Sequence, residues 1–489
     1  MAKHLILLLL SLGVGSAVSQ GPPAEQSTGW NSTFKLSPEQ LQLANLSTAE
    51  GDVLNTIINF DRSQLVNGGP HEDDFYNVQN IPKDEIPTEP GKRIKLQEFT
   101  DPASYSIPPK TAISRIIYTT TDINGTLIPA SAYILWPYQP KQFHNKKHNR
   151  SSAAPAVLWT HGTSGFYASG GPSTRRDLFY ADYIPYALAE AGYAVVAPDY
   201  AGLGVGTSWD GSHIPHQYFV REAGAGDALN AMRAALESFP EDLSHDYVVM
   251  GHSQGGAVAW GLSEVLARKD HAYKDIAKGH LGTVLAAPPT DALSVEAAPF
   301  ISWIGKDLDQ IYPEFNLTDW FTPLGVSRTE LLNQVEGSQF VSSYLFQPQD
   351  AIVRPDWRES SVVEKFEQLA NPGRKPFKGP ILLMHGITDP VVSYDINVAT
   401  VEDTCKQYPG DLEFLTVPDA GHFPVMSAAQ QTWLRWIEDR FQGHRVAKRG
   451  CVKSRLDSFR PLDHYQKVST SFWQWAGKAE WAYELPTAA

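Results

Sequence analysis

Cysteine is scarce in this chain of 489 residues, which contains only Cys405 and Cys451. Two cysteines are too few for a disulfide-stapled scaffold, and neither lies in the Cys/His spacing typical of a metal site, so we expect no metal. In an oxidising compartment the two can form a single bridge that would tie the C-terminal tail to the fold. Two free thiols are the alternative.

Positive charge is also low. The 40 lysines and arginines are outnumbered by 54 aspartates and glutamates, which gives a formal net charge of −14. A surface of that sign repels phosphate backbones, so we expect no nucleic-acid partner. Hydrophobic residues make up 42% and charged residues 19%, which is ordinary globular composition and excludes a disordered, collagen-like or coiled-coil chain. At roughly 150 residues per domain the length corresponds to about three domains, or to one large α/β core with insertions.

Long apolar runs are absent after the first residues of the chain. The run at residues 5–10 follows Lys3 and precedes the small residues Ala17-Val18-Ser19. This pattern predicts a secretory signal peptide over residues 1–19, because a membrane anchor needs a longer apolar span. We therefore expect a secreted protein with no integral membrane span. Five glycosylation sequons agree with export; they begin at Asn31, Asn45, Asn124, Asn149 and Asn316.

The remaining chain divides into segments of different pattern. Residues 20–110 show little periodicity and are expected to form an N-terminal extended segment, with one short helix starting at Ser37-Pro38. Two β-rich runs follow at 112–120 and 126–136. From residue 155 onward, short apolar runs alternate with helical patterns, which predicts an α/β fold with a mostly parallel sheet and helices on both faces. The runs expected to be strands are 156–160, 193–197, 247–250, 281–286, 380–385 and 412–417.

One interval interrupts this alternation. Residues 291–378 carry helical patterns but no convincing strand, and Ser327-Arg328-Thr329-Glu330 is a capping-box pattern that predicts a helix start. We expect a helical lid insertion there, which divides the α/β core into a first part at 111–290 and a second part at 379–442. Residues 443–489 form a C-terminal tail with tryptophans that are expected to pack on the body of the protein; they are Trp473, Trp475 and Trp481.

Gly251-His252-Ser253-Gln254-Gly255 directly follows the predicted strand 247–250 and opens a predicted helix. This is the strand–turn–helix setting of a G-x-S-x-G nucleophile elbow. The turn is so sharp that a side chain at either glycine would collide with the backbone, and it lifts the serine hydroxyl above the sheet. Ser253 is therefore the candidate nucleophile. The alternative is a glycine-rich helix start selected for packing.

A serine hydroxyl needs a base, and the base needs an orienting carboxylate. In a fold with this elbow the chain order is Ser, then Asp or Glu, then His. Asp389 and His422 each lie just past a predicted strand, where such sheets bind ligands, and they are the candidate acid and base. Asp419 is a competing acid, although its place at the end of the same strand as His422 suits a turn residue. His252 and His385 are expected to be packing residues.

An oxyanion that develops on the substrate needs two backbone N–H donors. The amide of Gln254, directly after the nucleophile, is one candidate. The other is the amide of Thr163, in the loop after strand 156–160, with Gly162 as the alternative. The glycines within residues 199–206 superficially suggest dinucleotide binding, but an acidic residue precedes them and no tight glycine turn leads into a helix, so we expect no cofactor.

Together these residues resemble the α/β-hydrolase superfamily, and more closely the secretory lipase family of fungi and bacteria, of the lipase A type. The resemblance covers roughly residues 85–442 and rests on the elbow, the loops of Asp389 and His422, and residues 192–204 and 227–234. It implies an α/β-hydrolase fold, a triad of Ser253, Asp389 and His422, and a lid domain at 291–378. The tail has no counterpart in that family.

These observations predict a secreted serine hydrolase that cleaves carboxylic esters through an acyl-enzyme on Ser253, without metal or cofactor. The expected substrate is a small-molecule ester or a lipid. A peptidase, an acyltransferase, and a biosynthetic ester or lactone hydrolase are alternatives, because they use the same machinery. A catalytically silent domain used for binding is an alternative of a different class.

Overall fold

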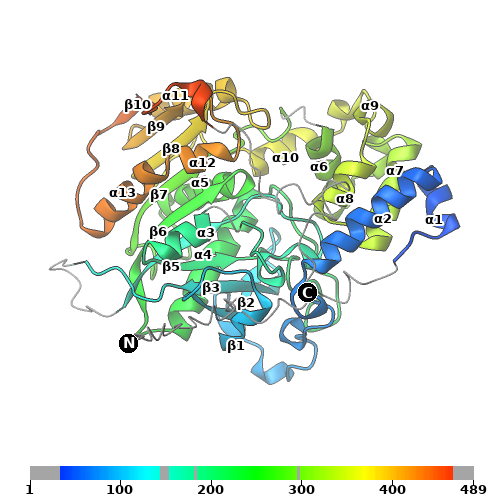
Figure 1. The fold of residues 1–489 in the computed structure, drawn as a ribbon, viewed down its shortest axis with the longest axis horizontal. Helices are drawn as coiled ribbons and strands as arrows, with labels where there is room; N and C mark the ends of the chain where they lie inside the picture. The colour runs from blue at the N-terminus through cyan, green and yellow to red at the C-terminus, as the bar shows by residue number, and fades with distance from the viewer. Residues whose placement is uncertain (1–33, 144–152, 181–183, 295–297, 466–489) are drawn as a thin grey trace, which may run out of the picture.

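The computed structural model of the protein describes residues 34–143, 153–180, 184–294 and 298–465 (Figure 1). Its centre is a ten-stranded sheet with the strand order β1-β2-β3-β5-β4-β6-β7-β8-β9-β10. The strands are β1 (Arg93–Thr100), β2 (Ala112–Thr121), β3 (Leu127–Trp136), β4 (Ala154–Thr160), β5 (Ala194–Pro198), β6 (Leu243–His252), β7 (His280–Ala286), β8 (Ile381–Gly386), β9 (Leu412–Val417) and β10 (Cys451–Arg455). The helices are α1 (Pro38–Leu43), α2 (Thr48–Ser63), α3 (Ile184–Glu190), α4 (Arg221–Ser238), α5 (Gln254–Ala267), α6 (Ala298–Ile311), α7 (Pro323–Val335), α8 (Gln339–Leu345), α9 (Gln349–Ile352), α10 (Val363–Ala370), α11 (Tyr394–Gln407), α12 (Pro424–Ala428) and α13 (Gln430–Phe441).

The sheet is mixed: its β1 end is antiparallel and its β10 end is parallel. Strands β1, β2, β3 and β5 pair antiparallel in that order, whereas every pairing from β5 through β10 is parallel. All residues of β4, β5 and β8 are buried, which explains why their sequences are continuous apolar runs rather than alternating ones. The predicted α/β fold with a mostly parallel sheet is confirmed.

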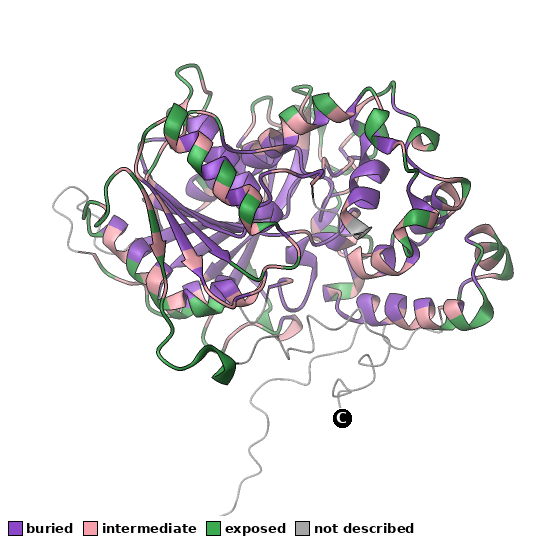
Figure 2. Cartoon of the chain, turned by 90° about the horizontal axis from the view of Figure 1, so that it is seen from above, coloured by how far each residue is buried: buried purple, intermediate pink, exposed green. Residues whose placement is uncertain are grey.

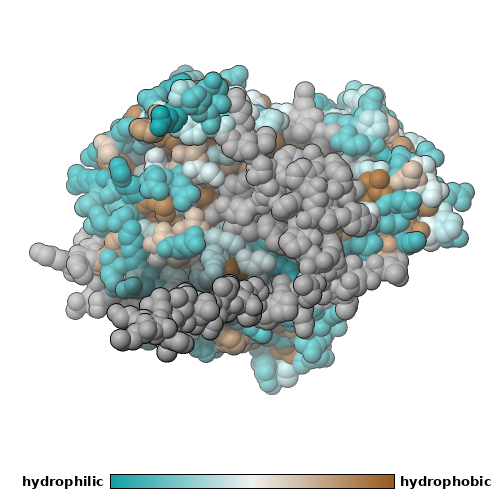
Figure 3. All heavy atoms as spheres, viewed as in Figure 1, coloured by the Kyte–Doolittle hydropathy of each residue, from teal (hydrophilic) through white to brown (hydrophobic). Residues whose placement is uncertain are grey.

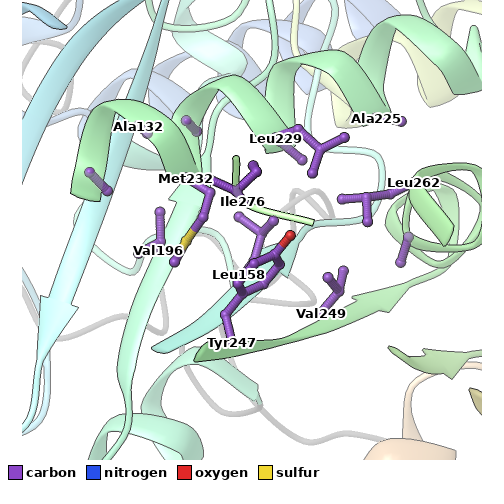
Figure 4. Packing of buried hydrophobic residues seen from close by; sticks show 14 of the residues in the cluster. Ala132, Leu158, Val196, Ala225, Leu229, Met232, Tyr247, Val249, Leu262 and Ile276 are labelled. Carbon is purple, nitrogen blue, oxygen red and sulfur yellow. The ribbon is translucent and has the colours of Figure 1, made fainter. Parts of the chain in front are cut away.

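Helices cover both faces of the sheet. On one face α4 and α5 lie over the strands, and Leu229 and Leu262 point toward Leu158 and Val249 (Figure 4). On the other face α3 and α13 share a second buried cluster with the intervening strand residues, such as Val157. The sheet is therefore buried from both sides, while the outer surfaces of the helices are exposed (Figure 2).

The N-terminal segment contains more helix than its sequence pattern predicted. The short helix at Pro38 is present as α1, with Ser37 and Gln40 in a reciprocal capping box. The expectation of an otherwise extended segment is wrong at α2, which is 16 residues long. A second capping box, between Ser47 and Glu50, starts α2, and its apolar face packs against the helical insertion (Figure 1).

The insertion consists of α6 to α10. Its buried apolar residues form one hydrophobic core together with residues of α1 and α2. Between residues 298 and 378, the described residues form no strand beyond a single bridge between Phe321 and Val353. The predicted helix start at Ser327 is wrong, because α7 begins at Pro323. Thr322 is its N-cap and accepts a hydrogen bond from Gly325 N, and proline suits the first helical position, so Ser327 lies inside the helix.

The C-terminal tail contributes an edge strand that the sequence pattern did not predict. Strand β10 pairs in parallel with β9, with Cys451 opposite Leu412. A disulfide joins Cys451 to Cys405 on α11, and of the two alternatives for these cysteines the structure therefore has the bridge. The three tail tryptophans lie outside the described residues, as do the predicted signal peptide, Asn31 and Asn149.

The other sequon asparagines, Asn45, Asn124 and Asn316, are exposed. Among the described residues, no helix is both long and apolar enough to cross a bilayer. On the face shown in Figure 3, hydrophilic side chains gather around α11.

Candidate active site

Ser253 occupies the sharp turn between β6 and α5. Its backbone has φ 55° and ψ −127°, which a non-glycine residue rarely adopts. A Cβ atom at Gly251 would lie 2.2 Å from Gly255 O, and one at Gly255 would lie 2.0 Å from Thr160 O. Both glycines are therefore required by close backbone contacts, as the elbow pattern predicted.

Asp389 and His422 lie on the loops after β8 and β9, and the structure brings them together. His422 Nδ1 lies 2.8 Å from Asp389 Oδ2. Oδ1 of the same carboxylate accepts hydrogen bonds from the amides of Val391 and Val392 at 2.8 and 3.0 Å. The carboxylate that contacts the His422 ring is therefore Asp389, while the competing Asp419 lies in the turn after β9 with φ 49°.

The electrostatic surroundings keep Asp389 ionised. Burial alone would raise the pKa of the Asp389 carboxyl, but hydrogen bonds from His385 and His422 outweigh burial and hold that pKa well below its usual range. An ionised carboxylate can orient the His422 ring through Nδ1, which leaves Nε2 as the nitrogen available to a serine hydroxyl.

His252 connects the elbow to the loop of the base. Its Nε2 donates to the carbonyl oxygen of His422 at 3.0 Å, and its Nδ1 accepts from the hydroxyl of Tyr180 at 2.9 Å. The His252 and His422 rings are 4.6 Å apart between centroids. Within the described part of the chain, no hydrogen bond joins Ser253 Oγ to the His422 ring in this conformation. Such bonds are often long in enzymes without bound substrate.

The loop after β4 lies directly against the nucleophile. A Cβ atom at Gly162 would lie 3.2 Å from Ser253 Cβ. The Gly162 amide donates to the hydroxyl of Tyr180 at 3.1 Å, so it is already engaged. The amides of Thr163 and Gln254 donate to no other group in the described residues. Of the two alternatives in this loop, Thr163 therefore has the available N–H.

Tyr180 and the insertion are connected to this loop in ways that sequence reasoning missed. Tyr180 lies in an irregular stretch with no motif, so no local pattern marks it. Thr163 Oγ1 is 2.7 Å from the hydroxyl of Tyr218, whose backbone N donates to Asp307 of α6 at 2.7 Å. The neighbouring Lys306 is only 2% exposed, and its ammonium lies 4.7 Å from the centre of the Tyr167 ring. The insertion is therefore linked to the candidate oxyanion loop through Tyr218.

Burial also shifts the titration of the groups around the site. It raises the pKa of Asp307 to about 7 and lowers that of Lys306. It lowers the pKa of His161 to about 4 and that of His216 to about 3, so these two histidines are neutral near pH 7. In the described ranges, no three His, Cys, Asp or Glu side chains form a group that could hold a metal ion.

The sequence of this chain is similar to a known protein family and to two fungal lipases. A family model described as the alpha/beta hydrolase family matches residues 157–433. Lipase 4 of Candida albicans is 26% identical in an alignment 298 residues long that covers 55% of this chain and 60% of that protein. Lipase 5 of the same organism is 24% identical in an alignment 292 residues long that covers 55% of this chain and 59% of that protein. The chain thus spans less than two thirds of the length of these relatives.

Solved structures show the same fold. Candida antarctica lipase A in its closed state matches with a TM-score of 0.62 at 14% identity, covering 85% of this chain and 94% of that one. The rice cell wall degrading esterase LipA from Xanthomonas oryzae matches with a TM-score of 0.54 at 18% identity, covering 72% and 98%. The family model covers more than half of the chain and includes the elbow, the Asp389 loop and the His422 loop, so the chain belongs to the α/β-hydrolase family.

Proposed function

We propose that the protein is a secreted serine hydrolase that cleaves carboxylic esters through an acyl-enzyme on Ser253. The observation that carries this proposal is the Asp389–His422 pair at 2.8 Å, on loops that converge on a strained serine elbow. A binding module has no need of an ionised, buried carboxylate aimed at a histidine ring. The names of the relatives, two lipases and an esterase, agree with an ester substrate.

The geometry supports the following reaction. Ser253 Oγ attacks the ester carbonyl carbon while His422 Nε2 takes the hydroxyl proton. The amides of Thr163 and Gln254 donate to the tetrahedral oxyanion, and Asp389 stabilises the imidazolium. His422 then protonates the leaving alcohol. Water, activated by the same histidine, attacks the acyl-enzyme and releases the acid and the free serine.

We further propose that the protein is exported and that its helical insertion is a lid. Residues 1–19 act as a signal peptide, and the disulfide and the exposed sequon asparagines agree with passage through an oxidising secretory route. The insertion acts as the lid, because α6 contacts the oxyanion loop through Asp307 and Tyr218.

The experiment compares the purified protein with its Ser253→Ala variant. We expect a fluorophosphonate probe to label the wild type at Ser253, and ester turnover to fall by about three orders of magnitude or more in the variant. Undiminished turnover in Ser253→Ala would contradict the mechanism. Absence of labelling and of turnover in a folded wild type would favour the silent binding module.

A second comparison separates esterase from peptidase. We expect p-nitrophenyl esters to be cleaved faster than aminoacyl anilides of matched acyl group. Faster anilide cleavage would overturn the ester assignment in favour of a peptidase.

A further inference from the structure

A second histidine lies behind the candidate acid. His385, at the end of β8, is completely buried, and its Nε2 lies 3.3 Å from Asp389 Oδ2 and 3.2 Å from the carbonyl oxygen of Val392. A carboxylate oxygen and a carbonyl oxygen can only accept. The nitrogen that faces both must therefore carry the hydrogen.

The other ring nitrogen leads to the same assignment independently. His385 Nδ1 lies 2.9 Å from Asn397 Nδ2, which also lies 2.7 Å from the carbonyl oxygen of Pro288. The Pro288 oxygen accepts only, so the amide group that faces it must be the NH₂ end of Asn397. Asn397 Oδ1 in turn accepts from the hydroxyl of Thr290 at 2.7 Å, which fits this orientation. The second hydrogen of the NH₂ group then points at His385 Nδ1, which must be an acceptor without a hydrogen.

We propose that Asn397 and His385 are positioning residues for the triad: Asn397 keeps His385 neutral with its hydrogen on Nε2, and His385 uses that hydrogen to orient Asp389 toward His422. This inference deepens the proposed function and rests on it for its effect on turnover. The sequence pattern marked His385 only as a packing residue, and α11, which carries Asn397, had no predicted role.

The arrangement has a defined electrostatic role. Because His385 is neutral, the hydrogen on Nε2, which lies between Val392 O and Asp389 Oδ2, stabilises the carboxylate without supplying a charge. The negative charge of Asp389 therefore remains available to the imidazolium that forms on His422 during the reaction. A charged His385 would instead compete with His422 for the same carboxylate.

The first test measures the protonation state of His385 directly. In protein labelled with ¹⁵N-histidine, the ring signals that disappear in the His385→Gln variant are assigned to His385. We expect them to show a neutral ring with the hydrogen on Nε2. We expect the Asn397→Asp variant, which offers an acceptor to Nδ1, to convert the same ring to the doubly protonated form. A wild-type ring that carries its hydrogen on Nδ1, or that is charged near pH 7, would overturn the inference whatever the protein catalyses.

The second test uses ester turnover. We expect His385→Leu to lower kcat about 10- to 100-fold with little change in KM, and to move the acid limb of the kcat/KM profile to higher pH, because Asp389 without this donor attracts a proton more strongly. His385→Gln keeps an N–H donor of similar reach and should recover most of the loss. Thr404→Val is the matched control: it removes a buried hydroxyl that accepts from Arg374 N, at the far end of α11. It should lower stability without moving the acid limb.

The outcomes separate the two proposals. If His385→Leu keeps the wild-type kcat and acid limb, or if His385→Gln is no better than His385→Leu, the positioning role is wrong while the hydrolase assignment stands. If the wild type neither turns over esters nor reacts with the probe, the proposed function fails, and the ring signals still decide the hydrogen-bond arrangement. The ring measurement reads the wild-type protein and needs a variant only to assign the His385 signals, for which His385→Gln must fold.

Discussion

At Ser253 the main chain is held in its unusual conformation by contacts with the neighbouring backbone. The amide of Ser253 donates to Ala286 O at 2.9 Å, and the absence of side chains at Gly251 and Gly255 lets the start of α5 pack against the end of β6 and the end of β4. The strain of such a residue, of order 1–3 kcal/mol, is offset by the packing around it. We therefore expect the reactivity proposed for Ser253 to depend on Gly251 and Gly255, which have no side chain.

Gly255→Ala tests this dependence. The added methyl group would lie 2.0 Å from Thr160 O, so the turn must open and displace Ser253 from His422 and from the Thr163 amide. We expect kcat/KM to fall about 100-fold or more, measured with a short ester, because a displacement of about 1 Å is enough for such a loss.

Gly226→Ala on α4 is the control, because the nearest atom to its added methyl group, the Tyr273 hydroxyl, is 3.5 Å away. That change should stabilise the helix by roughly 0.5–1 kcal/mol and leave turnover intact. Equal activity in the two variants would contradict the steric account of the elbow.

Asp227 provides a pH-dependent prediction at the same scale. Burial raises the pKa of its carboxyl to about 7, although Ala201 N and the Thr120 hydroxyl both donate to it. In the unfolded chain the pKa of an aspartate is about 3.9. Between about pH 4 and pH 7 the folded protein therefore holds one proton more than the unfolded chain, and the contribution of Asp227 to stability falls as pH rises through that window.

We expect Asp227→Asn to be progressively less destabilising, or more stabilising, relative to the wild type as pH rises from 4 to 7. Urea unfolding at several pH values measures the difference in free energy of unfolding. Asp84→Asn, at an exposed position, is the control and should give a difference that changes little with pH. A destabilisation by Asp227→Asn that stays constant, or that grows as pH rises, would be inconsistent with a raised pKa.

At the scale of elements, the strands were predictable where burial on both faces makes the sequence apolar throughout. The runs predicted at 156–160, 281–286 and 412–417 match β4, β7 and β9 closely. Strand β10 was missed, because Cys451-Val-Lys-Ser-Arg alternates between intermediate and exposed residues at the edge of the sheet and has no apolar run. The positions of the candidate residues Ser253, Asp389 and His422 were predictable because each follows a strand in the required order.

The helices were less predictable, because their starts depend on capping rather than on apolar pattern. Helix α7 starts at Thr322-Pro323 although Ser327 and Glu330 have the spacing of a capping box. Helix α2 has such a box at Ser47, but the polar composition around it concealed its apolar face. Tyr180 and Asn397 act only through contacts between segments distant in the sequence, so no local pattern could identify them.

The disulfide between α11 and β10 yields an element-scale prediction. It closes a loop with a sequence separation of 46 residues, for which the loss of unfolded-state entropy corresponds to roughly 3–4 kcal/mol of stability. We expect the Cys405→Ser/Cys451→Ser double variant to lose up to about that amount in urea unfolding. Ester turnover at 25 °C should persist, because no triad residue lies on β10. Unchanged stability in the double variant would mean that β10 is held by its strand pairing alone.

At the scale of the whole molecule, the export assignment can be tested on the processed protein. We expect protein recovered from the medium of a secreting fungal host to begin at Gln20 and to decrease in mass on treatment with an N-glycosidase. Asn124→Gln should remove one glycan, because Asn124 lies exposed in the turn between β2 and β3. Protein that starts at Met1 or remains inside the cell would contradict the signal peptide.

The shared core of the insertion and the N-terminal helices limits how the molecule can admit a substrate. Leu54 and Ile57 of α2 belong to the same buried cluster as Leu331 and Trp320 of the insertion. A swing of the insertion by itself would tear that cluster apart and expose its apolar side chains to water. We therefore expect that any opening toward the elbow moves the amino-terminal helices and the insertion together as one rigid block.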